Sequence, residues 1–263
     1  MKKFIISIDQ GTTSSRAILF NLKGKPVYSS QKEFTQYFPN SGWVEHDPEE
    51  IWSTTQKVLK DVIKKAKKIK GEILTIGITN QRETTVLWDK KTGKPVYNAI
   101  VWQDRRQEVF CEKLRRQNKE TLIFNRTGLL IDSYFSGIKI KWILDNVPKA
   151  KYLMSKKQLL FGTIDSFLIW RFTKGKVHAT DATNASRTMI YNISLNKWDD
   201  KILNLLKIKK HILPEVKDSA ADYGSTHPSI TGKSISISGV VGDQQSAAIG
   251  QCCFEPGSLK STY

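Results

Sequence analysis

Alternation between apolar and polar residues dominates the first hundred positions and predicts strands separated by short turns. The predicted strands are residues 3–8, 15–20, about 26–34, 73–79, 84–88 and 98–102. Polar residues at 21–26 separate the second strand from the third and are typical of a hairpin connection. The first part of the chain is therefore predicted to be rich in sheet.

One amphipathic helix interrupts this pattern, and its start is clearly marked. Asp47 is followed by Pro48 and, three residues on, by Glu50, which is the arrangement of a capping box with proline at the first helical position. Apolar residues follow at helical spacing as far as Ala66, with lysines on the opposite face. Strands on both sides of a helix predict a mixed α/β sheet with flanking helices.

The middle of the chain changes to a helical pattern. The predicted helices are residues 105–117, 137–146, 163–172 and 199–206, joined by polar segments such as 180–184. A strand at 235–241 and a helix at 243–251 follow. We interpret the chain as one sheet domain with a helical insertion, because no internal repeat is visible.

The last ten residues have a different pattern. Residues 254–263 are typical of a turn followed by the start of another strand. A strand that starts there has no evident partner, so we expect the chain to be cut inside an element.

Composition limits the possible classes of function. Lysine and arginine number 42 against 25 acidic residues, and the net charge of +17 raises the possibility of nucleic-acid binding. Only nine of these cations are arginine, and no nucleic-acid-binding motif accompanies them, so we attribute the charge to lysine-rich solvated surfaces. No run of roughly 18 apolar residues predicts a membrane span. We expect a cytoplasmic protein.

The three cysteines do not predict a disulfide framework or a zinc site. Cys111, Cys252 and Cys253 are too few and too irregularly spaced for either. We interpret the adjacent pair as small buried residues at the end of a helix.

A hydroxyl-rich turn follows the first predicted strand. Asp9 stands where that strand ends, and Thr12, Thr13 and Ser14 form the turn after it. Such a turn can be an ordinary hairpin or can cradle phosphate with backbone N–H and side-chain O–H groups. Asp9 favours the second interpretation, because a carboxylate at the end of a buried strand requires a partner such as a hydrated magnesium ion. Arg16 could reach a phosphate or form a surface ion pair.

A second carboxylate follows the predicted strand at 235–241. Gly242 permits a close approach of the backbone, and Asp243 stands at the start of the next predicted helix. Asp243 could be a helix N-cap, or it could be the base that accepts the proton of an attacking hydroxyl. One carboxylate beside a phosphate turn and another free to take a proton are the parts of a phosphoryl-transfer enzyme.

Three further positions could bind a substrate. Arg82 and Glu83 follow the strand at 73–79, where they could pair with each other or hydrogen-bond the hydroxyls of a polyol. Trp102 could pack in the core or form an apolar wall against substrate carbons. Tyr134 could be a core residue or a phenolic donor, and its sequence context does not decide.

Taken together, these motifs resemble the FGGY carbohydrate kinases over the whole chain. The matching segments are residues 8–16, 42–48, 77–85, 97–103, 183–189 and 242–245, and residues 134–146 are similar to the family's first signature. Gln-Arg-Glu at 81–83 is similar to the family members that phosphorylate glycerol, whereas xylulose kinases tend to carry Gln-Met-His there.

The resemblance implies an actin-like, ribonuclease-H-type fold of two domains with ATP in the cleft between them and Mg²⁺ as the metal. The residues that would hold glycerol are Arg82, Glu83, Trp102, Tyr134, Asp243 and Gln244, with Asp243 as the base. Asp9 would act on Mg²⁺ through water. The nucleotide phosphates would contact Thr12, Thr13, Ser14 and Arg16.

The resemblance also implies a division into domains. Residues 1–253 would be the N-terminal domain, and 254–263 the start of a C-terminal nucleotide-binding domain. Without that second domain we expect negligible activity, and with it a homo-oligomer. A non-catalytic polyol-binding fragment or a decayed gene product is the alternative. Ser133 stands where the family usually has proline, and the loop at 224–233 lacks the arginine that some members use to bind a regulatory sugar phosphate.

Overall fold

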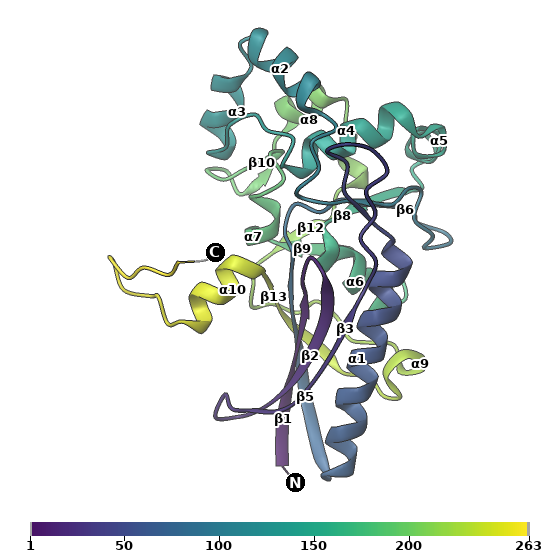
Figure 1. Ribbon diagram of the computed structural model, residues 1–263, viewed down its shortest axis with the longest axis vertical. Helices are drawn as coiled ribbons and strands as arrows, with labels where there is room; N and C mark the ends of the chain where they lie inside the picture. Colours follow the sequence, from purple (N-terminus) through teal and green to yellow (C-terminus); the bar gives the residue numbers. More distant parts are fainter. Residues whose placement is uncertain (1, 262–263) are drawn as a thin grey trace.

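The computed structural model describes residues 2–261 and is built around a five-stranded mixed sheet (Figure 1). The strands, in spatial order, are β13 (Ser236–Gly242), β5 (Gly71–Asn80), β1 (Lys2–Gln10), β2 (Ser14–Asn21) and β3 (Pro26–Glu33). β13, β5 and β1 run parallel, whereas β1, β2 and β3 pair antiparallel. The predicted sheet is confirmed.

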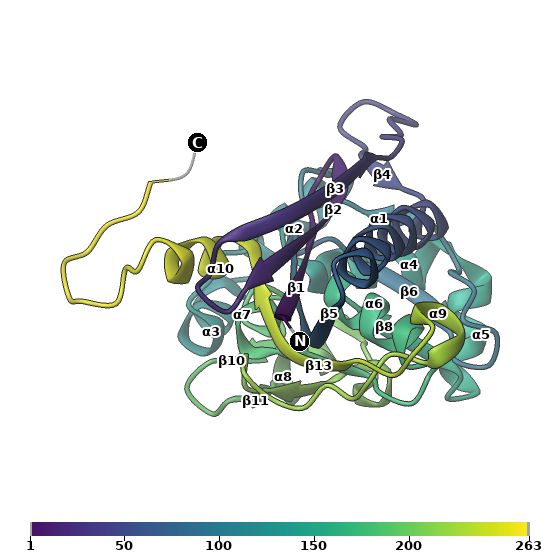
Figure 2. The ribbon, with the colours of Figure 1, turned by 90° about the horizontal axis from the view of Figure 1, so that it is seen from below.

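The long helix α1 (Pro48–Lys68) runs along this sheet (Figures 1 and 2). The Asp47 side chain accepts a hydrogen bond from the Glu49 N–H at 2.8 Å, and Pro48 is the first helical residue. The apolar residues from Ile51 to Ala66 are buried against the sheet. The lysines in the last turn of the helix interact favourably with the negative end of the helix dipole. The predicted start of this helix is confirmed.

The inserted segment forms a second layer with its own apolar core, in which Phe135, Ile138 and Phe161 are buried. Its elements are β6 (Val86–Asp89), α2 (Glu108–Arg116), α3 (Glu120–Thr127), α4 (Ser136–Asn146), α5 (Pro148–Ser155), β8 (Leu159–Gly162), β10 (Tyr191–Asn192), β11 (Lys197–Trp198), α8 (Asp200–Leu206) and a 3₁₀ turn (Lys210–Ile212). In Figure 1 most of this layer lies beyond one end of the sheet.

The remaining elements before β13 are short. These are β4 (Glu45–His46), β7 (Ala99–Ile100), α6 (Ile164–Phe172), β9 (Ala179–Asp181), α7 (Ala182–Ala185), β12 (Glu215–Lys217) and α9 (Pro228–Thr231). α10 (Asp243–Gly250) follows β13.

The structure corrects several element predictions. The strand expected at 98–102 is only β7, and Trp102 lies in the turn after it. Sequence analysis did not predict α3, α5 or β8, and the expected linker at 180–184 belongs to β9 and α7. These elements are short, so their identity depends on pairing with distant segments rather than on a local period.

The C-terminal segment also differs from the expectation. Residues 254–261 contain no strand, and Thr262 and Tyr263 lie outside the described residues. Figures 1 and 2 show this segment extending away from the body. Cys252 is exposed and Cys253 is partly exposed, so the prediction that both are buried was wrong. The preceding helix, α10, has no buried residue, so the cysteines at its end are not drawn into a core.

Within residues 2–261, no helix is both long and apolar enough to cross a membrane.

Candidate active site

The register of the three parallel strands brings the predicted site segments to one edge of the sheet. Gln10 lies opposite Asn80 on the neighbouring strand, and Asn80 lies opposite Gly242 on the next. The turn after β1, the bend at residues 81–83 and the first residue of α10 therefore leave the sheet side by side. This edge, at the carboxyl ends of parallel strands, is where open α/β sheets bind ligands.

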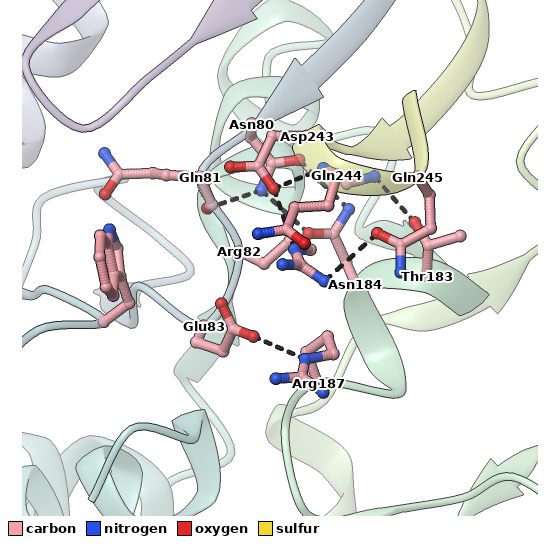
Figure 3. A network of polar contacts seen from close by, with 12 residues as sticks. Asn80, Gln81, Arg82, Glu83, Thr183, Asn184, Arg187, Asp243, Gln244 and Gln245 are labelled. Atoms are coloured by element: carbon pink, nitrogen blue, oxygen red, sulfur yellow. Dashed lines mark hydrogen bonds and ion pairs between the residues drawn. The ribbon is translucent and has the colours of Figure 1, made fainter. Parts of the chain in front are cut away.

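Arg82 and Asp243 form an ion pair across this edge, and Figure 3 shows the two side chains in contact. The Arg82 Nε donates to the Asp243 Oδ1 at 2.9 Å, and its Nη1 donates to the Gln245 Oε1 at 3.3 Å. The Arg82 side chain is 7% exposed, whereas that of Asp243 is 45% exposed. The buried Arg82 therefore holds the Asp243 carboxylate from the protein side and leaves the carboxylate accessible to solvent.

Asp243 is not the helix N-cap. Gly242 occupies the cap position, and Asp243 is the first helical residue. The carboxylate of Asp243 accepts a hydrogen bond from the Gln244 N–H at 2.7 Å, where the positive end of the helix dipole favours a negative charge. The Gln244 side chain is exposed beside it.

Glu83 pairs with Arg187 rather than with its neighbour Arg82. The Arg187 Nε donates to the Glu83 Oε1 at 2.7 Å, and the Glu83 side chain is 2% exposed. The Glu83 backbone has a φ of 59°, an unfavourable conformation for a residue with a side chain. Burial raises the pKa of Glu83, and the neighbouring arginines oppose that rise.

Tyr134 lies in the turn before α4, close to these charged groups. Its ring is half-buried, and burial followed by the charge of Glu83 raises the pKa of its phenol, which is therefore a neutral donor at physiological pH. The buried Lys139 donates a hydrogen bond to the Tyr134 backbone carbonyl. Burial lowers the pKa of Lys139 to about 7. Lys139 thus holds the turn that carries Tyr134.

Trp102 connects Tyr134 to the turn after β1. The Trp102 Nε1 donates to the Thr12 Oγ1 at 2.9 Å, and its ring centroid lies 5.7 Å from that of Tyr134. The indole is partly exposed, and its N–H bonds to the turn after β1 and not to a core residue. Of the two interpretations of Trp102, the wall fits this position better than core packing does.

The turn after β1 is a hairpin, and its charged residues pair with each other. Arg16 donates to the Asp9 carboxylate at 2.5 Å, and both side chains are partly exposed. Thr13 is exposed, and the Ser14 Oγ accepts a hydrogen bond from Gln31. Both the ordinary hairpin and the surface ion pair that the sequence left open are therefore present.

Asp9, near the end of β1, is an acidic side chain close to the turn that could serve Mg²⁺. Residues 2–261 contain no group of three or more histidine, cysteine or acidic side chains that could hold a metal ion. A single carboxylate together with substrate phosphates is, however, an ordinary way of holding hydrated magnesium. The Asp9 carboxylate fits that arrangement.

A buried polar network supports the edge from behind (Figure 3). The Thr183 hydroxyl donates to Asp181 at 2.7 Å and accepts the Gly242 N–H at 2.8 Å. Asn184 exchanges hydrogen bonds with Asn80 at 2.9 and 3.2 Å and also donates to Asp181. The network therefore ties the end of β5 and the end of β13 to α7.

Sequence analysis missed the roles of Thr183, Asn184, Arg187 and Gln245. All four lie inside segments that carry the family resemblance, but their partners at the sheet edge are 59 to 163 residues away in the sequence. Nothing local pointed to them. Two surface hollows of about 710 Å³ are lined by none of the predicted site residues.

Comparison with known proteins agrees with this geometry. Residues 4–250 match the description "FGGY family of carbohydrate kinases, N-terminal domain". The chain is 57% identical to a glycerol kinase of Rhizobium meliloti and 58% identical to one of Alkaliphilus metalliredigens; each alignment covers 100% of this chain and 53% of the relative. The chain thus spans about half the length of the curated relatives it matches.

Solved structures agree with the same assignment. A Plasmodium falciparum glycerol kinase with ADP has a TM-score of 0.93 at 37% identity, over 97% of this chain and 51% of that one. A gluconate kinase from Lactobacillus acidophilus has a TM-score of 0.81 at 25% identity, over 92% and 48%. The predicted fold class is confirmed, and the chain belongs to the FGGY family of carbohydrate kinases.

Proposed function

We propose that this chain provides the glycerol site and part of the phosphate site of an ATP-dependent glycerol kinase. The observation that carries the proposal is the meeting of the Arg82–Asp243 pair and Glu83 on the sheet edge that also carries the Asp9 turn. Identities of 57–58% to glycerol kinases support glycerol as the substrate.

In this proposal the polyol lies against polar and apolar groups of fixed position. Glu83 accepts a hydrogen bond from one hydroxyl, and Arg82 donates to another. Trp102 and Tyr134 form a wall against the carbon chain, and Gln244 closes the exposed side. Because Glu83 and Arg82 are buried and held by other side chains, glycerol would meet them already oriented.

Asp243 then acts as the base. The terminal hydroxyl of glycerol attacks the γ-phosphorus, the bond between this phosphorus and the β,γ-bridging oxygen breaks, and the hydroxyl proton passes to the Asp243 carboxylate. This proton leaves late in a loose transition state, so the carboxylate needs no unusual basicity. The ion pair with Arg82 holds Oδ1 and leaves Oδ2 to receive the proton.

The phosphate turn would rearrange on nucleotide binding. Arg16 would exchange its Asp9 partner for a phosphate oxygen, and Thr12, Thr13 and Ser14 would donate to the phosphates. Asp9 would then be free for the water shell of Mg²⁺, which when bound neutralises the charge on the transferring group.

We also propose that residues 1–253 form the N-terminal domain of a longer protein and that 254–263 begin a C-terminal nucleotide-binding domain. The share of the relatives that is covered supports this division. So does α10, which buries no residue here while Ile249 and Phe254 are exposed. From the family resemblance we also propose that the protein is cytoplasmic and that the full-length protein forms a homo-oligomer.

Glycerol binding is the direct test. Isothermal titration of the 263-residue chain with glycerol is expected to give saturable heat, because the polyol groups all lie on this chain. Arg82→Met should abolish that heat, since it removes a donor and frees Asp243 from its partner. Absence of saturable glycerol binding by a folded chain would contradict the proposal, and binding of gluconate or xylulose instead would reassign the substrate.

Gly242→Ala tests the geometry of the site. An added Cβ would lie 2.5 Å from the Arg82 Cδ and 2.8 Å from its Cγ, so Arg82 must move. We expect glycerol affinity to fall about tenfold or more, the value of one charge-assisted hydrogen bond. Gly250→Ala in the same helix has open space and is the matched control. Equal affinities in the two variants would contradict the expected role of Arg82.

A further inference from the structure

Arg187 lies directly against Glu83, although no feature of the neighbouring sequence predicted a function for it. It follows α7 in a turn, and its Nε donates to the Glu83 Oε1 at 2.7 Å. Its own N–H is fixed by the Asn184 carbonyl at 3.1 Å, so the buried polar network holds the turn. The Arg187 side chain is 27% exposed, whereas that of Glu83 is 2% exposed.

Within residues 2–261, Arg187 is the one side chain that hydrogen-bonds the Glu83 carboxylate. The Glu83 backbone carbonyl is held separately, by the Ser136 Oγ at 2.9 Å and the Thr85 Oγ1 at 3.0 Å. These two bonds hold the main chain and do not involve the carboxylate. Arg187 therefore sets which oxygen faces the protein, and Oε2 is left without a protein donor.

The guanidinium of Arg187 is itself held in place. Its centre lies 5.0 Å from the ring centroid of Phe135 and 5.8 Å from that of Tyr134. These distances are typical of cation–π contacts, which favour a charged and oriented guanidinium. One side chain thus contacts Glu83 together with the turn that carries Tyr134.

The charged groups around Glu83 make Arg187 the principal cation bonded to it. Burial raises the pKa of Glu83, while the hydrogen bond from Arg187 and the charges of Arg82, Arg187 and Lys139 lower it. Arg82 is bonded to Asp243, and Lys139 has a pKa of about 7 and donates to a carbonyl. The Tyr134 phenol is neutral, so it adds no charge to the surroundings of Glu83.

We propose that Arg187 is a positioning residue of the polyol site, which orients the Glu83 carboxylate and keeps it ionised so that Oε2 accepts a hydrogen bond from a substrate hydroxyl. This inference rests on the proposed function, in which Glu83 binds glycerol. It assigns a task to a residue that does not need to touch the substrate.

The test compares Arg187→Met with Arg187→Lys in the 263-residue chain. A ¹³C NMR titration of the side-chain carboxyl of Glu83 follows its protonation without any ligand. In Arg187→Met the titration midpoint is expected to rise, because a group that lowers the pKa of Glu83 has been removed. Arg187→Lys keeps the charge and should restore most of the difference, and it also serves if Arg187→Met does not fold.

Glycerol titration calorimetry on the same proteins gives the second measurement. At pH 8 we expect Arg187→Met to bind glycerol about 10- to 100-fold more weakly, the range for losing an interaction with a charged group. The deficit should grow at pH 6, because a raised Glu83 pKa leaves less carboxylate as the pH falls. Affinity in the unaltered chain should change less over this interval.

Arg126→Met is the matched control. Arg126 pairs with Asp199 at 2.9 Å, and its side chain is 25% exposed, so the substitution removes an arginine from a similar ion pair elsewhere. We expect it to leave both the Glu83 titration and glycerol binding unchanged. An equal effect of the two methionine variants would overturn the proposal.

The outcomes separate this inference from the proposed function. An unchanged Glu83 midpoint in Arg187→Met overturns the inference even if glycerol binds to the unaltered chain. A raised midpoint with glycerol binding that depends on pH supports it. If the unaltered chain binds no glycerol, the proposed function fails, and the role of Arg187 in polyol binding fails with it, whatever the Glu83 midpoint.

Discussion

Replacing Asp243 by asparagine is expected to slow phosphoryl transfer to glycerol by about 10²- to 10⁴-fold, the usual contribution of a general base. Asparagine keeps an oxygen for the hydrogen bond from Arg82 but cannot take the proton of the attacking hydroxyl. The fold and the glycerol affinity should therefore change little. Because the 263-residue chain alone is expected to have negligible activity, the rate is measured on this chain joined to the proposed C-terminal domain, in a single-turnover assay with γ-labelled ATP, Mg²⁺ and excess protein.

Asp145→Asn is the control for this experiment. Asp145 forms a surface pair with Lys141 in α4, and its side chain is 53% exposed. The same change of residue should leave the transfer rate within about twofold of the unaltered chain, because surface substitutions of this kind have little effect. If Asp243→Asn transferred phosphate as fast as Asp145→Asn, Asp243 would not be the base.

The largest expected effect on stability comes from Arg106→Met. The Arg106 side chain is 1% exposed and donates to Glu45 at 2.7 Å and to Asp104 at 2.8 Å. Its guanidinium also contacts the rings of Trp43 and Trp142, at 3.9 and 4.5 Å from their centroids. Methionine would leave two buried carboxylates without a cation, so we expect the free energy of unfolding to fall by about 3–5 kcal/mol.

Urea denaturation measures this difference, with Arg116→Met as the control. Arg116 pairs with Glu112 at 3.5 Å, and its side chain is 82% exposed. An exposed pair of this kind contributes at most about 1 kcal/mol. The destabilisation by Arg106→Met should also lessen at acidic pH, where the freed carboxylates can protonate. A loss no larger than that of the control would mean that the buried cluster reorganises without its arginine.

Local signals in the sequence were sufficient for the long elements and for the places where the site residues leave them. Asp47, Pro48 and Glu50 marked the start of α1, because a helix start depends on residues within one turn of each other. Apolar patterns likewise located β1, β2, β5 and β13, so Asp9 and Asp243 could be placed at or just beyond strand ends. The family resemblance then suggested their roles, and the fold class it implied was confirmed.

The partners of those residues could not be read in the same way. Arg82 and Glu83 are adjacent in sequence, yet one pairs with Asp243 and the other with Arg187. The first pairing exists because β13 lies next to β5, with Gly242 opposite Asn80. Neither the order of strands nor their register is encoded by the residues next to Arg82.

The apolar pattern of residues 235–251 predicted a strand and a helix, and both are present, but it also suggested that Cys252 and Cys253 would be buried. The two cysteines follow the exposed end of α10, a helix in which no residue is buried and Ile249 is exposed. Periodicity reports what a segment can form, because backbone hydrogen bonds are local in a helix. Burial and ion pairing depend on which distant surface arrives beside it, and that is settled only when the whole chain packs.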